Sequence, residues 1–345
     1  MTQRGPVTSI AYAPDGGLLV TGSGDNAIRL WQPQTGALVA TLRGHSDWVF
    51  DVAFSPDSST IASASWDGTA RLWRVRGGTL LHTLRHADLV WHVAFAPDGQ
   101  TVATATQNGT VSVWRVADGT LLRTWQAHDK AAHAVAFTSD GQTIVSGGDD
   151  GLVKVWRAGD GALRETFQIG SRVLSVALSP DGSKIAVGSW DGMVRVWQPN
   201  TGALLATLRG HTGRVFSVVF APDGQRLLST GDNGLARLWR AGDGALLATM
   251  SARQHELAQC NLSQGWRLLQ RCHVEPSSNR LMYAATFSPD GQHIAISDGT
   301  TLRIDPPDSP FGALLTQGTL FAAGGFCLLL SVVFLLWGLR YRIAN

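Results

Sequence analysis

Two sets of side chains in this sequence have the types and spacing of a hydrolytic centre. The first set is His45, Ser63 and Asp67, and the second, in the same order and at the same spacing, is His128, Ser146 and Asp150. A histidine between a serine and an aspartate is the arrangement that activates a nucleophile in hydrolases. Because the set recurs along the chain, it favours a repeated structural unit over a single catalytic centre.

A regular series of six tryptophans defines that unit. Successive members are 41 or 42 residues apart: Trp31, Trp73, Trp114, Trp156, Trp197 and Trp239. A period of about 40–45 residues, each containing an aromatic strand, is typical of β-propellers. In the second period, alternating apolar residues and turn residues predict strands at 49–54, 60–65, 69–73 and 79–84. Each period therefore predicts one four-stranded blade.

The turn after the first strand of each period indicates the number of blades. Its Pro-Asp-Gly pattern or a variant occurs seven times, at residues 14–16, 56–57, 97–99, 139–141, 180–182, 222–224 and 289–291. The seventh period has no tryptophan, and Ile304 takes its position. The sequence therefore predicts an all-β fold with a seven-bladed propeller of four-stranded blades over residues 1–317.

Residues 7–317 resemble the WD-repeat family. The family's Gly-His pair occurs as Gly44-His45 and Gly210-His211, although the aspartate that usually follows the tryptophan is absent throughout. The resemblance implies one buried hydrogen-bonded tetrad of histidine, serine, aspartate and tryptophan in a blade. The matching residues are His45, Ser63, Asp67 and Trp73 in the second blade, and His128, Ser146, Asp150 and Trp156 in the fourth. We therefore expect the two His–Ser–Asp sets to be structural.

The same resemblance implies that two blades are looser than the others. The third has Asn108 in place of the aspartate, and the fifth has Ile169 and Val187 in place of the histidine and the serine. Members of the family mostly bind partners and seldom catalyse reactions, so we expect a scaffold and not an enzyme.

One face of the predicted ring has three outward positions in each blade. They lie three and five residues after the histidine position and one residue before the hairpin aspartate. Tryptophan, phenylalanine and arginine, which are enriched at interface hot spots, occupy many of them. We predict a surface for protein or peptide partners formed by Trp48, Phe50, Trp66, Trp91, His133, Arg172, Trp190, Arg214 and Phe216. In the alternative interpretation, some of these rings turn inward and pack the central channel.

Composition argues against several other functions. The net charge is only +2 and no run of lysine or arginine occurs, so nucleic-acid binding is not expected. Cys260, Cys272 and Cys327 lack the close pairs of a zinc site, and we expect no metal or cofactor. The alternative function is a ligand-binding or enzymatic propeller that uses the central channel, for which the face offers only His133, Asp149 and Asp232.

The C-terminal part of the chain is different in composition. Residues 318–339 are almost wholly apolar, and a helix of that length spans about 33 Å, close to the hydrocarbon thickness of a bilayer. We predict one transmembrane α-helix at 318–339 and a short tail at 340–345. An insertion at 251–280 precedes the seventh period. Residues 312–316 form either the fourth strand of the seventh blade or the start of the membrane span.

Two orientations in the membrane are open. No signal peptide precedes the first strand, which favours a tail-anchored, single-pass protein whose propeller faces the cytosol. Arg340 and Arg342, set against Asp305 and Asp308, favour the alternative of an exported propeller with a cytoplasmic C-terminal tail. The expected partners are thus a protein or peptide, and the membrane through residues 318–339.

Overall fold

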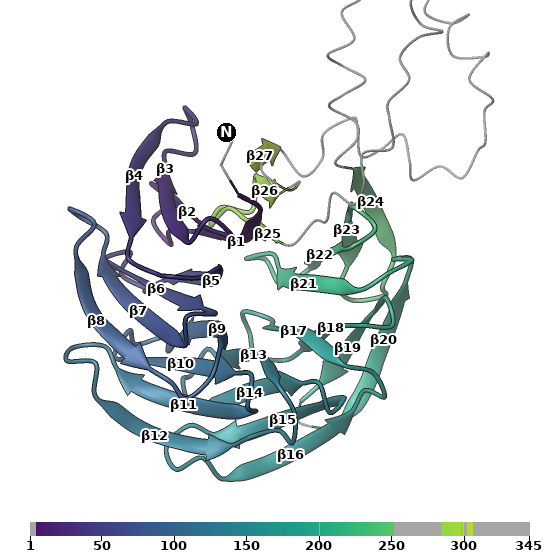
Figure 1. The fold of residues 1–345 in the computed structure, drawn as a ribbon. Helices are drawn as coiled ribbons and strands as arrows, with labels where there is room; N and C mark the ends of the chain where they lie inside the picture. Colours follow the sequence, from purple (N-terminus) through teal and green to yellow (C-terminus); the bar gives the residue numbers. More distant parts are fainter. Residues whose placement is uncertain (1–4, 200, 252–283, 298, 300–301, 306–345) are drawn as a thin grey trace, which may run out of the picture.

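Antiparallel sheets follow one another around a ring in the computed structural model, which describes residues 5–199, 201–251, 284–297, 299 and 302–305 (Figure 1). Six of the sheets have four strands, and we number them blades one to six in chain order. In each of them the first strand lies nearest the centre of the ring and the fourth lies at its outer edge (Figure 1).

The strands of the six blades have nearly uniform lengths. Blade one contains β1 (Val7–Tyr12), β2 (Leu19–Ser23), β3 (Ala27–Trp31) and β4 (Leu38–Arg43). Blade two contains β5 (Val49–Phe54), β6 (Thr60–Ser65), β7 (Thr69–Arg74) and β8 (Leu80–Arg85). Blade three contains β9 (Val90–Phe95), β10 (Thr101–Thr106), β11 (Thr110–Arg115) and β12 (Leu121–Gln126). Blade four contains β13 (Ala132–Phe137), β14 (Thr143–Gly148), β15 (Leu152–Arg157) and β16 (Leu163–Gln168). Blade five contains β17 (Val173–Leu178), β18 (Ile185–Ser189), β19 (Met193–Gln198) and β20 (Ala203–Arg209). Blade six contains β21 (Val215–Phe220), β22 (Arg226–Gly231), β23 (Leu235–Arg240) and β24 (Leu246–Ser251).

The last sheet is smaller than the prediction required. It has three strands, β25 (Ala285–Phe287), β26 (Ile294–Ser297) and β27 (Leu302–Asp305), and it lies between blade six and blade one. The prediction of seven four-stranded blades is therefore wrong, because the described residues form six such blades and one three-stranded sheet. The Pro-Asp-Gly turn indicates only the two strands that it joins.

The sequence also predicted a transmembrane helix. The described residues contain no helix, and hence none of sufficient length and apolarity to cross a membrane. The predicted span at 318–339, the tail at 340–345, the insertion at 251–280 beyond Ser251 and the segment 312–316 all lie outside the described residues.

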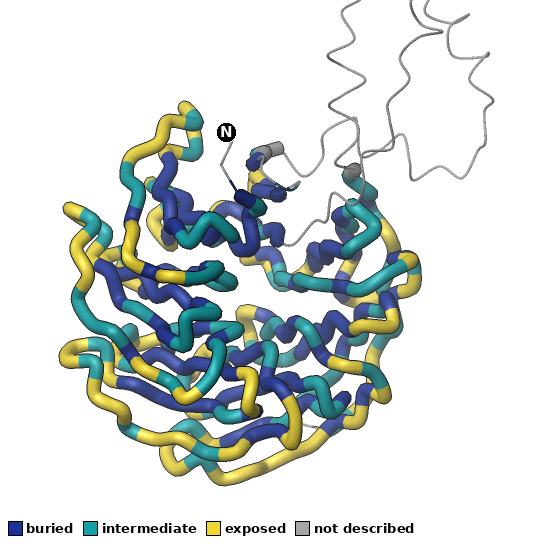
Figure 2. The backbone as a smooth tube through the Cα atoms, in the orientation of Figure 1, coloured by how far each residue is buried: buried dark blue, intermediate teal, exposed yellow. Residues whose placement is uncertain are grey.

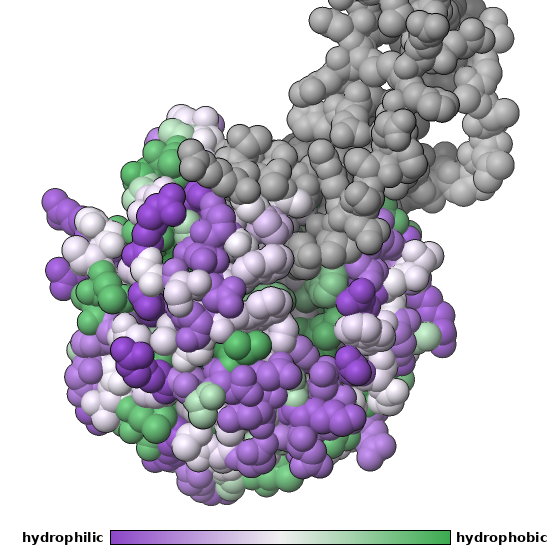
Figure 3. Space-filling view, viewed as in Figure 1, coloured by the Kyte–Doolittle hydropathy of each residue, from purple (hydrophilic) through white to green (hydrophobic). Residues whose placement is uncertain are grey.

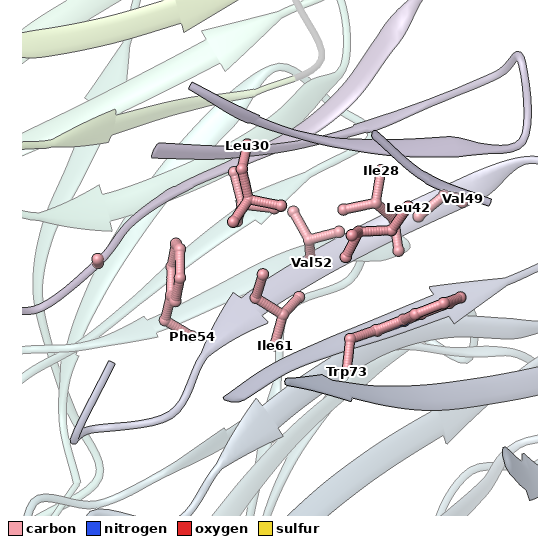
Figure 4. Packing of buried hydrophobic residues seen from close by; sticks show 10 residues of the cluster. Ile28, Leu30, Leu42, Val49, Val52, Phe54, Ile61 and Trp73 are labelled. Carbon is pink, nitrogen blue, oxygen red and sulfur yellow. The ribbon is translucent and has the colours of Figure 1, made fainter. Parts of the chain in front are cut away.

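Hydrophobic contacts between neighbouring sheets hold the ring together. Between blades one and two, Ile28, Leu30 and Leu42 pack against Val52 and Ile61 (Figure 4). Equivalent clusters lie between the other neighbours, and the three-stranded sheet packs against blade one through Leu302 and against blade six through Phe287. The second strands are accordingly almost entirely buried, the first strands contain both buried and half-buried residues, and the fourth strands are mostly exposed or half-buried (Figure 2). Burial of such side chains contributes about 1.5–3 kcal/mol each.

Apolar side chains outside this core are dispersed. The face in Figure 3 is mostly hydrophilic where the structure describes it, with separate apolar patches. Each fourth strand has an exposed leucine at the same position: Leu38, Leu80, Leu121, Leu163, Leu204 and Leu246. Each of them pairs in register with the tryptophan of its blade. Single apolar residues of this kind are normal on protein surfaces.

Candidate functional site

A depression of about 570 Å³ lies where the first strands of the blades begin. The first strand of every four-stranded blade contains a β-bulge at this end, since the pairing register skips one residue there. A bulge turns the side chain of the skipped residue out of the regular alternation. The skipped residues, all of which line the depression, are Thr8, Phe50, Trp91, His133, Leu174 and Phe216.

The structure brings all nine residues of the predicted partner surface into the lining of this one depression. Bulges place four of them, and the connection before the first strand or the hairpin between the second and third strands places the others. Gly68, with a φ of 77°, closes the hairpin that holds Trp66, and a positive φ at such a turn favours glycine. The nine residues therefore share a location, whereas their role in partner binding stays a prediction.

An aromatic cluster forms one side of the depression and consists of Trp48, Phe50, Trp66 and Trp91. Trp66 stacks between the other two rings of blade two, with centroids 5.4 Å from Trp48 and 5.5 Å from Phe50. Trp91 of blade three meets Phe50 and Trp66 edge to face, at 4.6 and 5.3 Å. All four side chains are only partly buried. The interpretation that these rings turn inward is thus right only in part, because they pack on each other and still line the depression.

An arginine–tryptophan stack, consisting of Arg172, Trp190 and Arg214, forms the opposite side. The guanidinium carbon atoms of Arg172 and Arg214 lie 5.0 and 4.2 Å from the Trp190 ring centroid. Trp190 is 43% exposed, the largest exposure among the tryptophans in the described chain. Arg214 also lies over the ring of Phe216, at 5.6 Å. Cation–π contacts of this kind hold a guanidinium flat and restrict its rotamers.

His133 and Asp149 of blade four connect the two sides. The His133 ring lies 4.5 Å from that of Trp91, and its Nε2 atom is 2.9 Å from Asp149 Oδ1. The hydrogen bond from His133 lowers the pKa of Asp149, although partial burial opposes this. Asp149 Oδ2 lies 3.9 Å from Arg172 Nη1. An ionised carboxylate is therefore fixed between the aromatic cluster and the arginines.

Polar groups of the innermost strands also line the depression. Asp51 accepts hydrogen bonds from Ser9 Oγ at 2.7 Å and from the backbone N–H of Val93 at 3.0 Å, and so joins three blades. Two nitrogen atoms here, Trp66 Nε1 and His92 Nδ1, are buried and have no hydrogen-bond partner among the described residues. Buried polar atoms without partners are uncommon in native proteins, and a functional site is one of the places where they occur.

The two His–Ser–Asp sets lie elsewhere, inside their blades. In blade two, His45 Nδ1 is 2.8 Å from Asp67 Oδ2, His45 Nε2 is 2.7 Å from Ser63 Oγ, and Trp73 Nε1 donates to Ser63 Oγ at 2.9 Å. Ser63 is 0% exposed. The matching distances in blade four are 2.9, 2.8 and 2.9 Å, among His128, Ser146, Asp150 and Trp156. Neither serine is accessible to a substrate.

The pKa shifts in the tetrad of blade two agree with its hydrogen bonds. Burial lowers the pKa of His45, which favours the neutral imidazole. Hydrogen bonds from His45 and Thr69 lower the pKa of Asp67 well below its usual range and outweigh the effect of burial. A neutral histidine that donates from Nδ1 to Asp67 and accepts at Nε2 from Ser63 leaves each member with a partner.

The other blades depart from this pattern in different ways. Blade six has Asn233 in the aspartate position, 3.2 Å from His211. In blade three, Trp114 donates to Thr104, but His86 Nε2 has no partner in the described chain. In blade five, Trp197 Nε1 likewise has none. The hydrogen-bond networks of blades three and five are therefore incomplete, whereas that of blade six keeps both histidine contacts although it too has asparagine in the aspartate position.

Several residues of the depression were not found by sequence reasoning. Ser9, Asp51 and His92 come from the innermost strands, where each blade faces the middle of the ring. Their only signal in the sequence was a polar residue next to the bulge position. No group of three or more histidine, cysteine or acidic side chains suited to hold a metal occurs in the part of the chain that the structure describes.

The ring of blades and the recurring buried tetrad define a WD-repeat β-propeller. The chain belongs to the family described as the IFT122 first beta-propeller, whose model matches residues 6–269. A probable serine/threonine-protein kinase, PkwA, of Thermomonospora curvata is 41% identical over 49 residues, which cover 14% of this chain and 7% of that protein. An uncharacterized WD repeat-containing protein of Nostoc sp. (strain PCC 7120) is 40% identical over 45 residues, which cover 13% of this chain and 3% of that protein. These relatives share about one repeat with this chain, so they support the repeat and nothing about a shared activity.

Proposed function

We propose that this WD-repeat propeller is an interaction scaffold that binds an extended segment of a partner protein in the central depression. The observation that carries the proposal is the aromatic cluster beside the arginine–tryptophan stack. A few hot-spot residues supply most of the binding energy at protein interfaces, and tryptophan and arginine that line a pocket are enriched among them. The remaining apolar surface is dispersed over the outer strands, so this depression offers the most concentrated anchor in the described chain.

Selection of a displayed library of random linear peptides on the full chain tests the proposal. We expect enriched peptides whose affinity falls by about tenfold or more in Trp91→Ala, because that ring contacts three other rings of the depression. Trp125→Ala is the matched control, since Trp125 is also partly buried but lies on β12 and packs on Trp156. Trp190→Ala serves as a second variant because its exposure makes a folding defect improbable.

Two results would overturn the proposal. One is the enrichment of no peptide above the level obtained with Trp91→Ala. The other is an equal loss of affinity in Trp91→Ala and in Trp125→Ala, which would report on general stability and not on the depression. Thermal unfolding of the three variants separates these readings.

We also propose that the apolar stretch at 318–339 attaches the propeller to a membrane, with the propeller on the cytosolic side. The support is the composition of the sequence alone. The expected result is co-sedimentation of the full chain with liposomes after alkaline washing, and its loss when Leu329 and Val333 are both replaced by arginine. Protease protection of residues 5–251 inside sealed cellular vesicles would contradict the cytosolic orientation. Retention of the double arginine variant would contradict the attachment.

A further inference from the structure

We propose that the bound segment presents a carboxylate to Arg172 and Arg214 and a large apolar side chain to the aromatic cluster. This inference rests on the proposed function and specifies the class of segment: a linear peptide with an acidic residue close to an aromatic or aliphatic one. The two sides of the depression are chemically unlike, so they also fix the direction in which such a segment lies.

The unsatisfied polar groups on the arginine side are hydrogen-bond donors. The Arg172 guanidinium makes no hydrogen bond within the described chain beyond its 3.9 Å ion pair with Asp149, and the side chain is 53% exposed. Arg214 donates from Nε to Asp232 Oδ2 at 2.9 Å, and its terminal nitrogen atoms have no described partner. A guanidinium carries five N–H donors in a planar fork. The open capacity of this side is therefore for an acceptor, and a carboxylate offers two acceptor oxygens in matching geometry.

The carboxylates of the depression, in contrast, are already engaged. Asp51 accepts from Ser9 and Val93, and Asp149 accepts from His133. Asp232 is paired with Arg214. A basic side chain from a partner would meet carboxylates that already have donors, whereas an acidic one meets terminal N–H groups of Arg172 and Arg214 that make no hydrogen bond in the described chain. This comparison favours an acidic partner group over a basic one.

Trp190 restricts the guanidinium groups of Arg172 and Arg214 before a carboxylate binds. Their guanidinium groups both stack on its ring, and this contact limits the side-chain entropy that binding would otherwise cost. Asp149 and Asp232 lie beside the arginines and offset part of their charge. A singly charged carboxylate therefore fits better than a phosphoryl group, which carries about −1.5 to −2 charges at neutral pH.

The test compares matched pairs of synthetic peptides taken from the displayed library. In each pair, one peptide keeps its acidic residue and the other has the corresponding amide. We expect the acidic peptide to bind the natural chain about tenfold more tightly or better, because a hydrogen bond to a charged group is lost in the amide. In the double variant Arg172→Gln, Arg214→Gln we expect the two peptides to bind within about twofold of each other.

Arg115→Gln is the matched control. The Arg115 side chain is 48% exposed and pairs with Asp118 at 2.9 Å, but it lies at the end of β11 away from the depression. This variant should keep the full preference for the acidic peptide. A second set of peptides with amidated C-termini distinguishes a side-chain carboxylate from a terminal one. Amidation should weaken binding only if the arginines bind the terminal carboxylate.

The outcomes separate the inference from the proposed function. Peptides that bind through Trp91 without any preference for acid over amide overturn the inference and leave the proposed function intact. A preference that persists in the double arginine variant also overturns it. If no peptide is enriched, the proposed function is overturned and the inference falls with it.

Discussion

Two neighbouring residues of blade two, Trp66 and Asp67, belong to regions that use the same side-chain types in opposite ways. Asp67 lies in the tetrad, where histidine, serine, aspartate and tryptophan all have partners and almost no exposure. Trp66 lies in the depression, where rings are partly exposed and several nitrogen atoms have no described partner. Residue type therefore does not distinguish the blade interior from the depression in this protein. Exposure of the side chains does.

The largest expected effect on the unfolding free energy comes from acidification, which acts on the buried histidines of the interior hydrogen-bond networks. Burial lowers the pKa of His86 and of His211 to about 4, so the unfolded chain binds protons below about pH 6.5 while the folded chain does not. Stability should therefore fall as the pH decreases from about 6.5 to about 4. At pH 5 each histidine should cost about 2 kcal/mol. Urea unfolding at pH 7 and pH 5 measures this, and equal unfolding free energies would refute it.

Removal of one tetrad member tests whether the closed network stabilises the fold. In Asp67→Ala, His45 Nδ1 loses its acceptor in a buried site, and we expect a loss of about 3 kcal/mol. Asp129→Ala is the control, because Asp129 is exposed and has no hydrogen bond in the described chain. Chemical unfolding of both variants decides the matter. A difference of less than about 0.5 kcal/mol between them would show that the network adds nothing.

Truncation of a side chain in the depression should weaken peptide binding and leave the stability of the fold nearly unchanged. Trp190→Ala removes the ring between Arg172 and Arg214, and we expect the affinity for acidic peptides to fall by about tenfold. The unfolding free energy should change by less than about 1 kcal/mol, since the Trp190 ring lies at the surface with 43% of the residue exposed. Titration with peptide and urea unfolding are both needed. A loss of stability comparable with that of Asp67→Ala would erase the distinction between the two regions.

Much of this arrangement was accessible from the sequence because it is periodic. The position five residues after His45 is Phe50, and the bulge puts that residue and its equivalents into the depression in every four-stranded blade. The pairing of Arg172 and Arg214 on Trp190 was not accessible, since it depends on how adjacent blades rotate around the ring. The prediction of a complete seventh blade rested on the repeated turn, which indicates only the first two strands of a blade, and among the described residues the last sheet has three strands.

The smallest expected effect on the unfolding free energy comes from a substitution in the incomplete hydrogen-bond network of blade three. It gives the sharpest comparison between complete and incomplete networks. His86 Nε2 is buried without a described partner, while the His86 ring contacts Trp114 at 5.1 Å. His86→Leu removes the unpaired nitrogen and keeps a side chain of similar volume, so stability at pH 7 should change by less than about 1 kcal/mol.

His45→Leu, its counterpart in blade two, leaves Asp67 without its histidine and should cost about 3 kcal/mol. His86→Leu should also reduce the loss between pH 7 and pH 5 by about 2 kcal/mol, because the variant lacks the buried histidine whose pKa is about 4. Urea unfolding of the two variants at both pH values tests each part. Equal losses in the two variants at pH 7 would mean that the hydrogen bonds of a tetrad matter less than the volume of its histidine, and the contrast between closed and open networks would then not explain the stability of this propeller.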